Sequence, residues 1–214
     1  MTLIKAASLL VCALGLWACG STTSQSPDMA QAPDLATMPD LTATPDLAYP
    51  AGPYGVDVGS VLADWVGNGY RLTPASMDVT KTPFEPIALS SFRSCRCLYI
   101  DLTSNCLPPC RSEWSMVNDY MAGSPAAGFC PLEITLDDYA TNAPATKSFL
   151  DGYLTRNPHA FPVVILDAPA KARLPNPMAV PHVLVVDPAT MKILSSIDGF
   201  SDTGISDALT ACGL

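Results

Sequence analysis

The sequence from residue 50 onward predicts an α/β domain built on a mixed sheet. Three patterns support this: an apolar run at 97–103, "CLYIDLT"; a helical pattern directly after it; and a hairpin pattern near the end, "VPHVLVVDPATMKILSSIDG". Strands that alternate with helices imply a parallel pair, whereas a tight hairpin adds an antiparallel edge. The predicted order is strand, helix, strand, helix, strand, strand, helix.

The first three elements occupy residues 97–138. The run 97–103 is apolar almost throughout, as expected for a central strand buried on both faces. The next segment opens with Pro108 and Pro109, which suit a helix start because the first N–H groups of a helix need no partner. Residues 123–128 end this helix, and 130–138, "CPLEITLDD", form the next strand. Four residues share one face of the helix: Cys110, Trp114, Val117 and Met121.

The remaining elements follow in residues 141–214. Thr141 or Asn142 can cap a second helix that runs to about Arg156, with Pro144 in its first turn. The segment 161–167, "FPVVILD", is short and extended, and the hairpin strands follow it. The last segment, "SDTGISDALTACGL", is a short helix. The apolar sides of the two helices contain Phe149, Leu150, Tyr153 and Leu154 in the first, and Ile205, Leu209 and Cys212 in the second.

The chain begins with a pattern typical of an export signal. Lys5 precedes an apolar run at 6–18, which is too short to span a membrane. The end of this run, "LWAC" at 16–19, resembles a bacterial lipobox, with Trp17 bulky for its place. The resemblance implies cleavage of residues 1–18 and lipidation of Cys19, and Gly20 and Ser21 after it suggest the outer membrane of the cell envelope. The alternative is an ordinary signal peptide with a chance cysteine.

Residues 19–49 predict a disordered stalk. The dipeptide Pro-Asp recurs every six residues, starting at Pro27, and the segment has no Lys or Arg. Proline, alanine, threonine and aspartate bury too little apolar surface to offset the entropy of the chain, and recurrent proline keeps the backbone extended. We therefore expect one folded domain, 50–214, held away from a membrane by a spacer.

Charge and cysteine content restrict the function further. The formal net charge of −9 argues against nucleic acid as a partner, because such binding needs basic patches. Six cysteines remain outside Cys12 and Cys19, and an even number in an exported chain favours disulfides. They are Cys95, Cys97, Cys106, Cys110, Cys130 and Cys212. Their pairing stays open, although Cys95 or Cys97 can pair with Cys130, and Cys212 can be a buried thiol or a disulfide end.

The element order resembles the thioredoxin fold, and more closely its redoxin and peroxiredoxin-like branch. The resemblance rests on "PIALSSFRSCRCLYIDLT" at 86–103, on the later half from "FPVVILD" to "MKIL", on the cysteine pair near the first helix, and on Val180-Pro181 before the hairpin. It covers roughly residues 50–212. It implies a cis bond at Pro181 and a backbone at Val180 that faces the cysteine pair and a bound peptide.

The family's active-site motif is only partly kept. Cys110 with the preceding Pro109 matches the end of the Trp-Cys-Gly-Pro-Cys motif, and Glu113 matches a frequent Glu after it, but Leu107 occupies the place of the nucleophile. A thiol near a helix N-terminus favours the thiolate form. We therefore expect Cys106 to be the exposed attacking thiol and Cys110 the shielded resolving thiol of an oxidoreductase that acts on protein thiols or disulfides without a cofactor.

Two other functions remain open at this point. The first is a binding domain without catalysis, in which a Cys106–Cys110 disulfide fixes a loop. The second is a copper chaperone, because Sco-type proteins share the fold and have Cys-x-x-x-Cys at this place, and two thiolates with a histidine suit Cu(I). The candidate histidines are His159 and His182, and His182 misses the family position by about three residues. The sequence shows no phosphate loop, paired zinc motif or hydrolase elbow.

Overall fold

A mixed sheet organises the described part of the computed structural model. The structure describes residues 49–214 except 105–107, 139–140, 142 and 177–178. Within them seven strands form a sheet in the order β2-β1-β7-β4-β3-β8-β9. These strands are β1 (Val66–Tyr70), β2 (Phe84–Ala88), β3 (Cys97–Thr103), β4 (Phe129–Thr135), β7 (Val163–Ile165), β8 (His182–Asp187) and β9 (Lys192–Asp198). Two short strands, β5 (Asp137–Asp138) and β6 (Ala143–Pro144), pair separately.

The predicted combination of parallel and antiparallel pairing is confirmed. Strand β3 pairs in parallel with β4, and β4 pairs in parallel with β7. The hairpin β8–β9 is antiparallel, and β8 lies antiparallel to β3. The strand predicted at 97–103 has the observed bounds of β3, and all of its residues are buried. The domain is therefore an α/β domain with a mixed central sheet.

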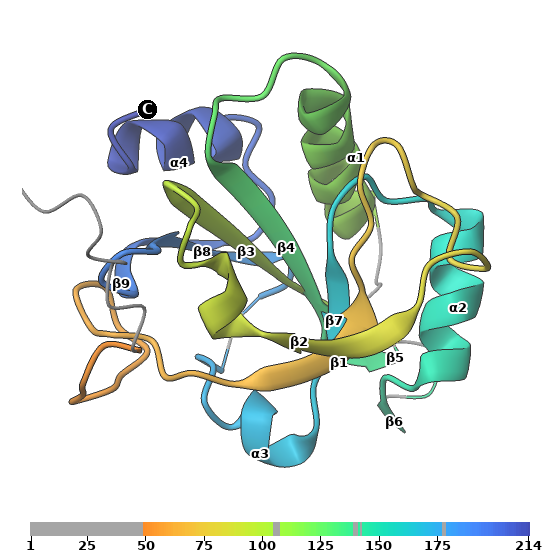
Figure 1. The fold of residues 1–214 in the computed structure, drawn as a ribbon, viewed down its shortest axis with the longest axis horizontal. Coiled ribbons are helices and arrows are strands. Elements are labelled where there is room, and N and C mark those ends of the chain that lie inside the picture. The colour runs from red at the N-terminus through yellow and green to blue at the C-terminus, as the bar shows by residue number, and fades with distance from the viewer. Residues whose placement is uncertain (1–48, 105–107, 139–140, 142, 177–178) are drawn as a thin grey trace, which may run out of the picture. The chain divides into compact units, whose positions relative to one another are not determined.

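Helices cover both faces of this sheet (Figure 1). The helices are α1 (Pro108–Ala122), α2 (Lys147–Arg156), α3 (Ala168–Lys171) and α4 (Gly204–Ala211), with the 3₁₀ helix η2 at Leu89–Phe92. In the orientation of Figure 1, α1 and α4 lie above the sheet and α3 lies below it. Odd-numbered β3 residues such as Tyr99 pack with α1 and α4, while even-numbered ones such as Ile100 pack with η2 and α3.

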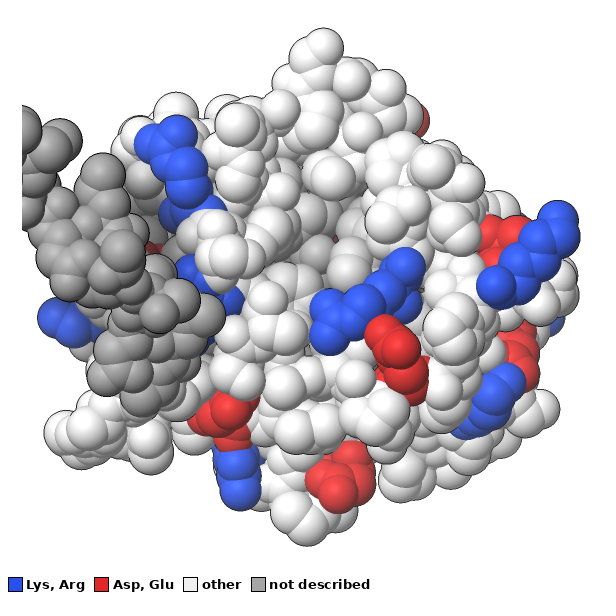
Figure 2. Space-filling view, in the orientation of Figure 1, with Lys and Arg blue, Asp and Glu red and all other residues white. Residues whose placement is uncertain are grey.

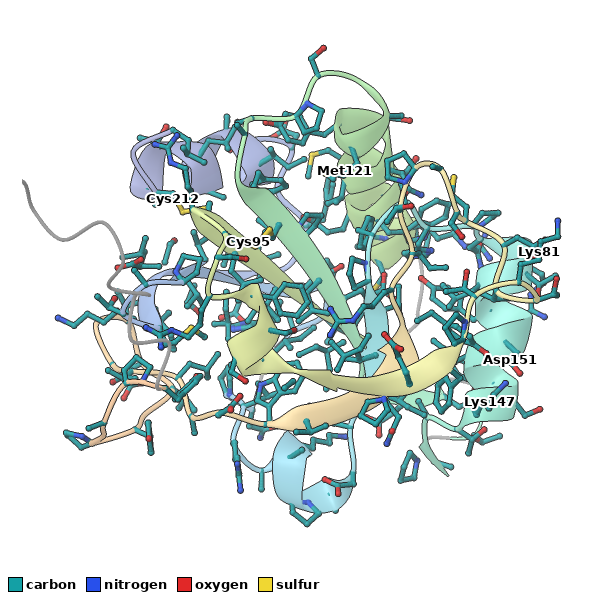
Figure 3. All side chains as sticks on the ribbon, in the orientation of Figure 1. Lys81, Cys95, Met121, Lys147, Asp151 and Cys212 are labelled. Carbon is teal, nitrogen blue, oxygen red and sulfur yellow. A yellow bond between two sulfur atoms is a disulfide. The ribbon has the colours of Figure 1, made fainter. Side chains whose placement is uncertain are left out.

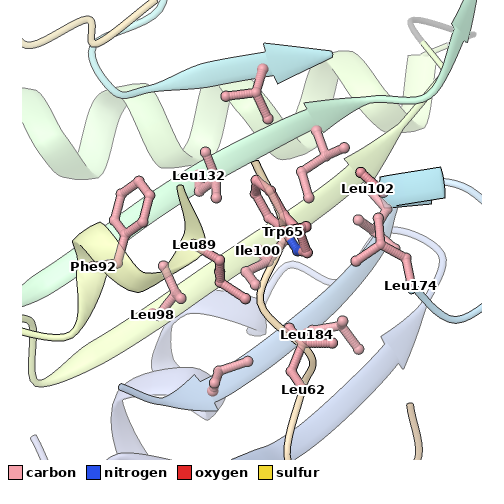
Figure 4. Packing of buried hydrophobic residues seen from close by; sticks show 14 of the residues in the cluster. Leu62, Trp65, Leu89, Phe92, Leu98, Ile100, Leu102, Leu132, Leu174 and Leu184 are labelled. Carbon is pink, nitrogen blue, oxygen red and sulfur yellow. The ribbon is translucent and has the colours of Figure 1, made fainter. Parts of the chain in front are cut away.

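The largest apolar cluster lies on the face away from α1 (Figure 4). Leu98, Ile100 and Leu102 of β3 project into it, and Trp65 packs against them from the segment before β1. Because successive residues of a strand face opposite sides, the same strand presents Tyr99 and Asp101 to the helices of the other face. Tyr99 and Asp101 therefore lie on the α1 face of the sheet.

Two predicted elements differ from the structure. The helix expected to start at Thr141 or Asn142 begins at Lys147 and is capped by Thr146, whose hydroxyl accepts a hydrogen bond from the N–H of Phe149. Pro144 is not in its first turn, because Ala143–Pro144 pairs with Asp137–Asp138. For the same reason the strand predicted at 130–138 is split into β4 and β5. Asn142 itself lies outside the described residues.

The hairpin of β1 and β2, which forms one side of the sheet, has no counterpart among the predicted elements. Strand β1, "VGNGY", contains two glycines, and β2 contains Pro86, so neither has a strong strand signal. A Cβ atom on Gly69 would lie 2.0 Å from the carbonyl oxygen of Val163 in β7. Glycine at this position therefore allows β1 to pair closely with β7.

The predicted signal segment, Cys19 and the Pro-Asp repeats fall in residues 1–48, outside the described residues. Among the residues that are described, none of the helices has the length and apolar character needed to span a bilayer.

Candidate redox site

Cys110 is the third residue of α1 and is buried. The first turn of a helix carries N–H groups without helical partners and the positive end of the helix dipole, which together favour a thiolate. Cys110 is thus shielded from solvent, and its role as a resolving thiol stays a prediction. Its expected partner, Cys106, lies outside the described residues.

Pro181 lies at the same edge of the sheet. The Val180–Pro181 peptide bond is cis, as the resemblance implied. Pro181 directly precedes β8, in which His182 is the register partner of Leu102 in β3. Since β3 ends at Thr103, Pro181 is placed beside the point where the chain leaves β3 toward α1. Pro181 therefore lies at the same edge of the sheet as the end of β3, from which the chain continues to α1.

A pocket of ≈ 570 Å³ opens at this edge. Its lining comes from the segments that follow β3, β4 and β7 and from the residue before Pro181. In open α/β sheets, ligands bind outside the carboxyl ends of parallel strands, and this pocket has that position. Ser104, Leu136 and Val180 are among the residues that line it.

The sheet face beneath α1 changes from apolar to polar along the strands. Tyr99 and Phe129, near the strand starts, belong to the apolar cluster under α1 and α4. Further along, Asp101 of β3 is the register partner of Glu133 of β4, and both are almost completely buried at 3% and 0% exposure. Two residues further along, Thr103 and Thr135 are also register partners and are also buried. Two buried carboxyl groups therefore lie side by side on strands that are mostly apolar.

His159 and Tyr153 complete this buried polar layer, which we define as Asp101, Glu133, Tyr153 and His159. The Nε2 atom of His159 lies 2.8 Å from Oε2 of Glu133, and the Tyr153 hydroxyl lies 3.4 Å from the same nitrogen. Burial raises the pKa of Tyr153, and the charges of Glu133, Asp101 and Cys110 add to the effect. Tyr153 is therefore close enough to Cys110 to sense its charge.

A third buried carboxyl group, that of Glu113, lies on α1 itself. Glu113 accepts a hydrogen bond from the Tyr99 hydroxyl, and burial raises its pKa although the hydrogen bonds from Tyr99 and from the Ser201 N–H oppose this. From the sequence, Glu113 was recognised only as a motif match, and Asp101 and Glu133 were not predicted to be site residues. The available signal was a carboxylate inside an apolar strand, as in "YIDLT" and "PLEIT".

The other four cysteines of the domain form two disulfides. Cys95 pairs with Cys130, as the sequence allowed, and Cys97 pairs with Cys212. These residues lie at or before the starts of β3 and β4 and at the end of α4, whereas Cys110 follows the end of β3. Figure 3 labels Cys95 and Cys212 in the upper half of the view, Cys212 beside α4 and Cys95 before β3.

The two histidines considered for copper are engaged inside the domain. His182 contacts Asp198 through Nδ1 at 2.7 Å and Ser196 through Nε2 at 3.2 Å, so both of its ring nitrogens have a partner within the hairpin. His159 contacts Glu133. In the described part of the chain, no group of three or more His, Cys, Asp or Glu residues could hold a metal ion. The copper reading therefore gains no support from the described residues.

Comparison with solved structures decides the fold. A protein from Chlorobium tepidum, assigned as a thiol:disulfide interchange protein DsbE, superimposes with a TM-score of 0.55 over 74% of this chain and 99% of its own, at 20% identity. The domain has a thioredoxin-like fold. Peroxidoxin BcpB from Mycobacterium tuberculosis gives a TM-score of 0.53 at 16% identity, over 74% of this chain and 97% of its own.

A third thioredoxin-like structure supports the same conclusion. A protein from Bacteroides thetaiotaomicron, assigned as a protein disulfide isomerase, gives a TM-score of 0.53 at 13% identity, over 75% of this chain and 90% of its own. No family model and no curated protein matches the sequence. At these identities the likeness defines the fold, and the activity has to be argued from the site.

Proposed function

We propose that the protein is an exported, lipid-anchored thiol–disulfide oxidoreductase that uses Cys106 and Cys110. The observation that carries the proposal is the position of Cys110, which is buried in the first turn of α1 above the buried polar layer. The remaining four cysteines are used in disulfides at the other end of β3. Redox chemistry in this domain therefore rests on Cys106 and Cys110.

The proposed cycle transfers two electrons from the cysteine pair to a substrate disulfide. The Cys106 thiolate attacks one sulfur of that disulfide, which forms a mixed disulfide and releases the first substrate thiolate. The Cys110 thiolate then attacks the Cys106 sulfur, closes the Cys106–Cys110 disulfide and releases the second substrate thiolate. The reverse sequence oxidises a dithiol substrate.

The second step requires that Cys110 lose a proton inside the domain. Asp101 supplies the acceptor in this proposal, because its carboxyl group lies on the sheet face beneath α1 and shares Tyr153 as a neighbour with Cys110. Because Asp101 and Cys110 are both buried, a proton transfer between them would take place away from solvent. The substrate is a protein thiol or disulfide, whose flanking chain would occupy the pocket lined by Ser104, Leu136 and Val180.

The proposed membrane tether rests on the lipobox-like sequence at residues 16–19. On the face in Figure 2, basic and acidic side chains are interspersed. Lipidation of Cys19 in the cell envelope remains part of the proposal. Replacing Cys19 with Ser should move the protein from the membrane fraction to the soluble fraction, and retention in the membrane would contradict the anchor.

A redox titration tests the activity. The protein is equilibrated in glutathione buffers, and the state of every cysteine is mapped by mass spectrometry. Structural disulfides resist reduction above about −300 mV, whereas catalytic pairs titrate at about −270 to −120 mV. We expect Cys106–Cys110 to titrate in the upper range, with Cys95–Cys130 and Cys97–Cys212 as internal controls. The C110S variant should trap a mixed disulfide on Cys106.

The competing function is a thioredoxin-fold binding domain without catalysis. Leu107 at the family's nucleophile position favours this reading. It predicts that a Cys106–Cys110 disulfide is as hard to reduce as the two internal controls, or that no such bond forms, and that C110S traps nothing. Stoichiometric Cu(I) binding that is lost in either cysteine variant would instead indicate a copper carrier.

A further inference from the structure

Four contacts hold His159 at a fixed position in the buried polar layer. Asn118 of α1 hydrogen-bonds the backbone of the residues directly before and after His159. Its Nδ2 donates to the carbonyl oxygen of Pro158 at 2.9 Å, and its Oδ1 accepts from the N–H of Ala160 at 2.8 Å. The ring of Trp114 packs on the imidazole with centroids 5.1 Å apart. On the opposite side the ring contacts Glu133, and no part of His159 is exposed.

The hydrogen bonds of His159 restrict where its protons can lie. Nδ1 lies 2.6 Å from the carbonyl oxygen of Asn157, which can only accept, so Nδ1 must carry a hydrogen. Nε2 then shares one further proton with Oε2 of Glu133, 2.8 Å away. Whether this proton sits on nitrogen or on oxygen, the Glu133–His159 pair as a whole carries no net charge.

This neutrality has a consequence for Asp101. Asp101 and Glu133 are register partners on adjacent strands and face the same side of the sheet. Two uncompensated carboxylates so close together and out of contact with solvent would share a proton, because each disfavours the charge of the other. With Glu133 neutralised by His159, the negative charge of this pair of carboxyl groups belongs to Asp101.

We propose that His159 is a positioning residue for the redox reaction: by sharing a proton with Glu133, it keeps Asp101 available as the base for Cys110. This inference rests on the proposed function. Two titratable groups neighbour the Glu133–His159 pair directly: Asp101 of β3, the register partner of Glu133, and Tyr153 of α2, whose hydroxyl lies 3.4 Å from Nε2 of His159. Cys110 of α1 acts on the same Tyr153 through its charge. The Glu113 carboxyl group on α1 is engaged with Tyr99 instead.

The test follows the second step of the cycle directly. The full chain, with Cys12 and Cys19 replaced by Ser, is reduced under conditions that spare the two structural disulfides and mixed with Ellman's reagent in a stopped-flow instrument. Attack by Cys106 releases one thionitrobenzoate at a rate that depends on reagent concentration. Attack by Cys110 on the mixed disulfide releases the second thionitrobenzoate at a rate that does not depend on reagent concentration. The rate of this second phase depends on pH, and the pH at which it is half-maximal is its midpoint.

The inference predicts a specific pattern among three variants. H159Q leaves Glu133 without its proton partner and should raise the midpoint by about one pH unit or more, because Asp101 and Glu133 then compete for a proton. E133Q keeps the charge beside Asp101 unchanged and should leave the midpoint at the wild-type value. The double variant E133Q/H159Q should return to that value, which makes E133Q the matched control and the rescue.

Each outcome distinguishes the two proposals. A second phase that is present but has the same midpoint in H159Q would overturn the role of His159 and leave the oxidoreductase standing. Absence of the second phase in the parent chain would remove the oxidoreductase and with it the inference. If H159Q fails to fold, ¹⁵N NMR of the parent chain decides, because a His159 ring without a hydrogen on Nδ1 contradicts the proton arrangement.

Discussion

The two structural disulfides should contribute unequally to stability, because they close loops of different length. Cys97 and Cys212 are 115 residues apart, whereas Cys95 and Cys130 are 35 apart. The loop-entropy relation gives about 4.8 kcal/mol for the longer loop and about 3.8 kcal/mol for the shorter one at 25 °C. Replacing both cysteines of a pair with Ala should therefore cost about 1 kcal/mol more for Cys97–Cys212.

Urea unfolding followed by circular dichroism measures this difference. With a slope of about 2 kcal/mol per M, the midpoint of C97A/C212A should lie about 0.5 M below that of C95A/C130A. Each double variant serves as the control for the other, since both lose two sulfur atoms near the starts of the central strands. Equal midpoints, or a lower midpoint for C95A/C130A, would refute the assignment of stability to loop length.

Three further variants test individual features of the fold. Burial raises the pKa of Glu113, so the folded state holds a proton more tightly and stability falls as the pH rises from the usual glutamate range through the raised pKa. E113Q, which still accepts from Tyr99, should remove this fall: unfolding midpoints should match the parent at pH 4 and exceed it at pH 8, and a lower midpoint at pH 8 would contradict the reasoning. G69A should destabilise the domain by about 1–3 kcal/mol in urea unfolding, because its Cβ meets the Val163 carbonyl oxygen at 2.0 Å. G152A, inside α2 with room for a Cβ, should instead stabilise it by about 0.5–1 kcal/mol, and equal effects of the two would refute the steric argument.

Local sequence patterns predicted an element correctly where its own residues determine its conformation. The run 97–103 is apolar because both faces of β3 are covered, and its bounds match the observed strand. The prolines at 108 and 109 stand at the start of α1, where their missing N–H groups break no helical bond. The last helix, with Ile205 on its buried side, was also placed correctly.

The local patterns failed where pairing with a distant segment decided the backbone. Pro144 reads as a helix-start residue, yet it belongs to β6 because it pairs with Asp137. Strand β1 has the composition of a loop, but its glycines let β7 approach closely enough to form a ladder. In both cases a tertiary contact outweighed a weak local preference.

The sequence by itself determined the order of most elements, the placement of Cys110 at a helix start and the mixed sheet. Those properties depend on residue periodicity and on backbone limits of proline, which act within a few residues of the chain. Only the tertiary structure decided the two disulfides and the meeting of Asp101, Glu133 and His159. Six cysteines allow fifteen pairings, and whether two carboxyl groups share a face depends on the register between strands. Register is fixed by packing of the whole domain, so residues 26 positions apart, such as Glu133 and His159, come into contact without any local signal.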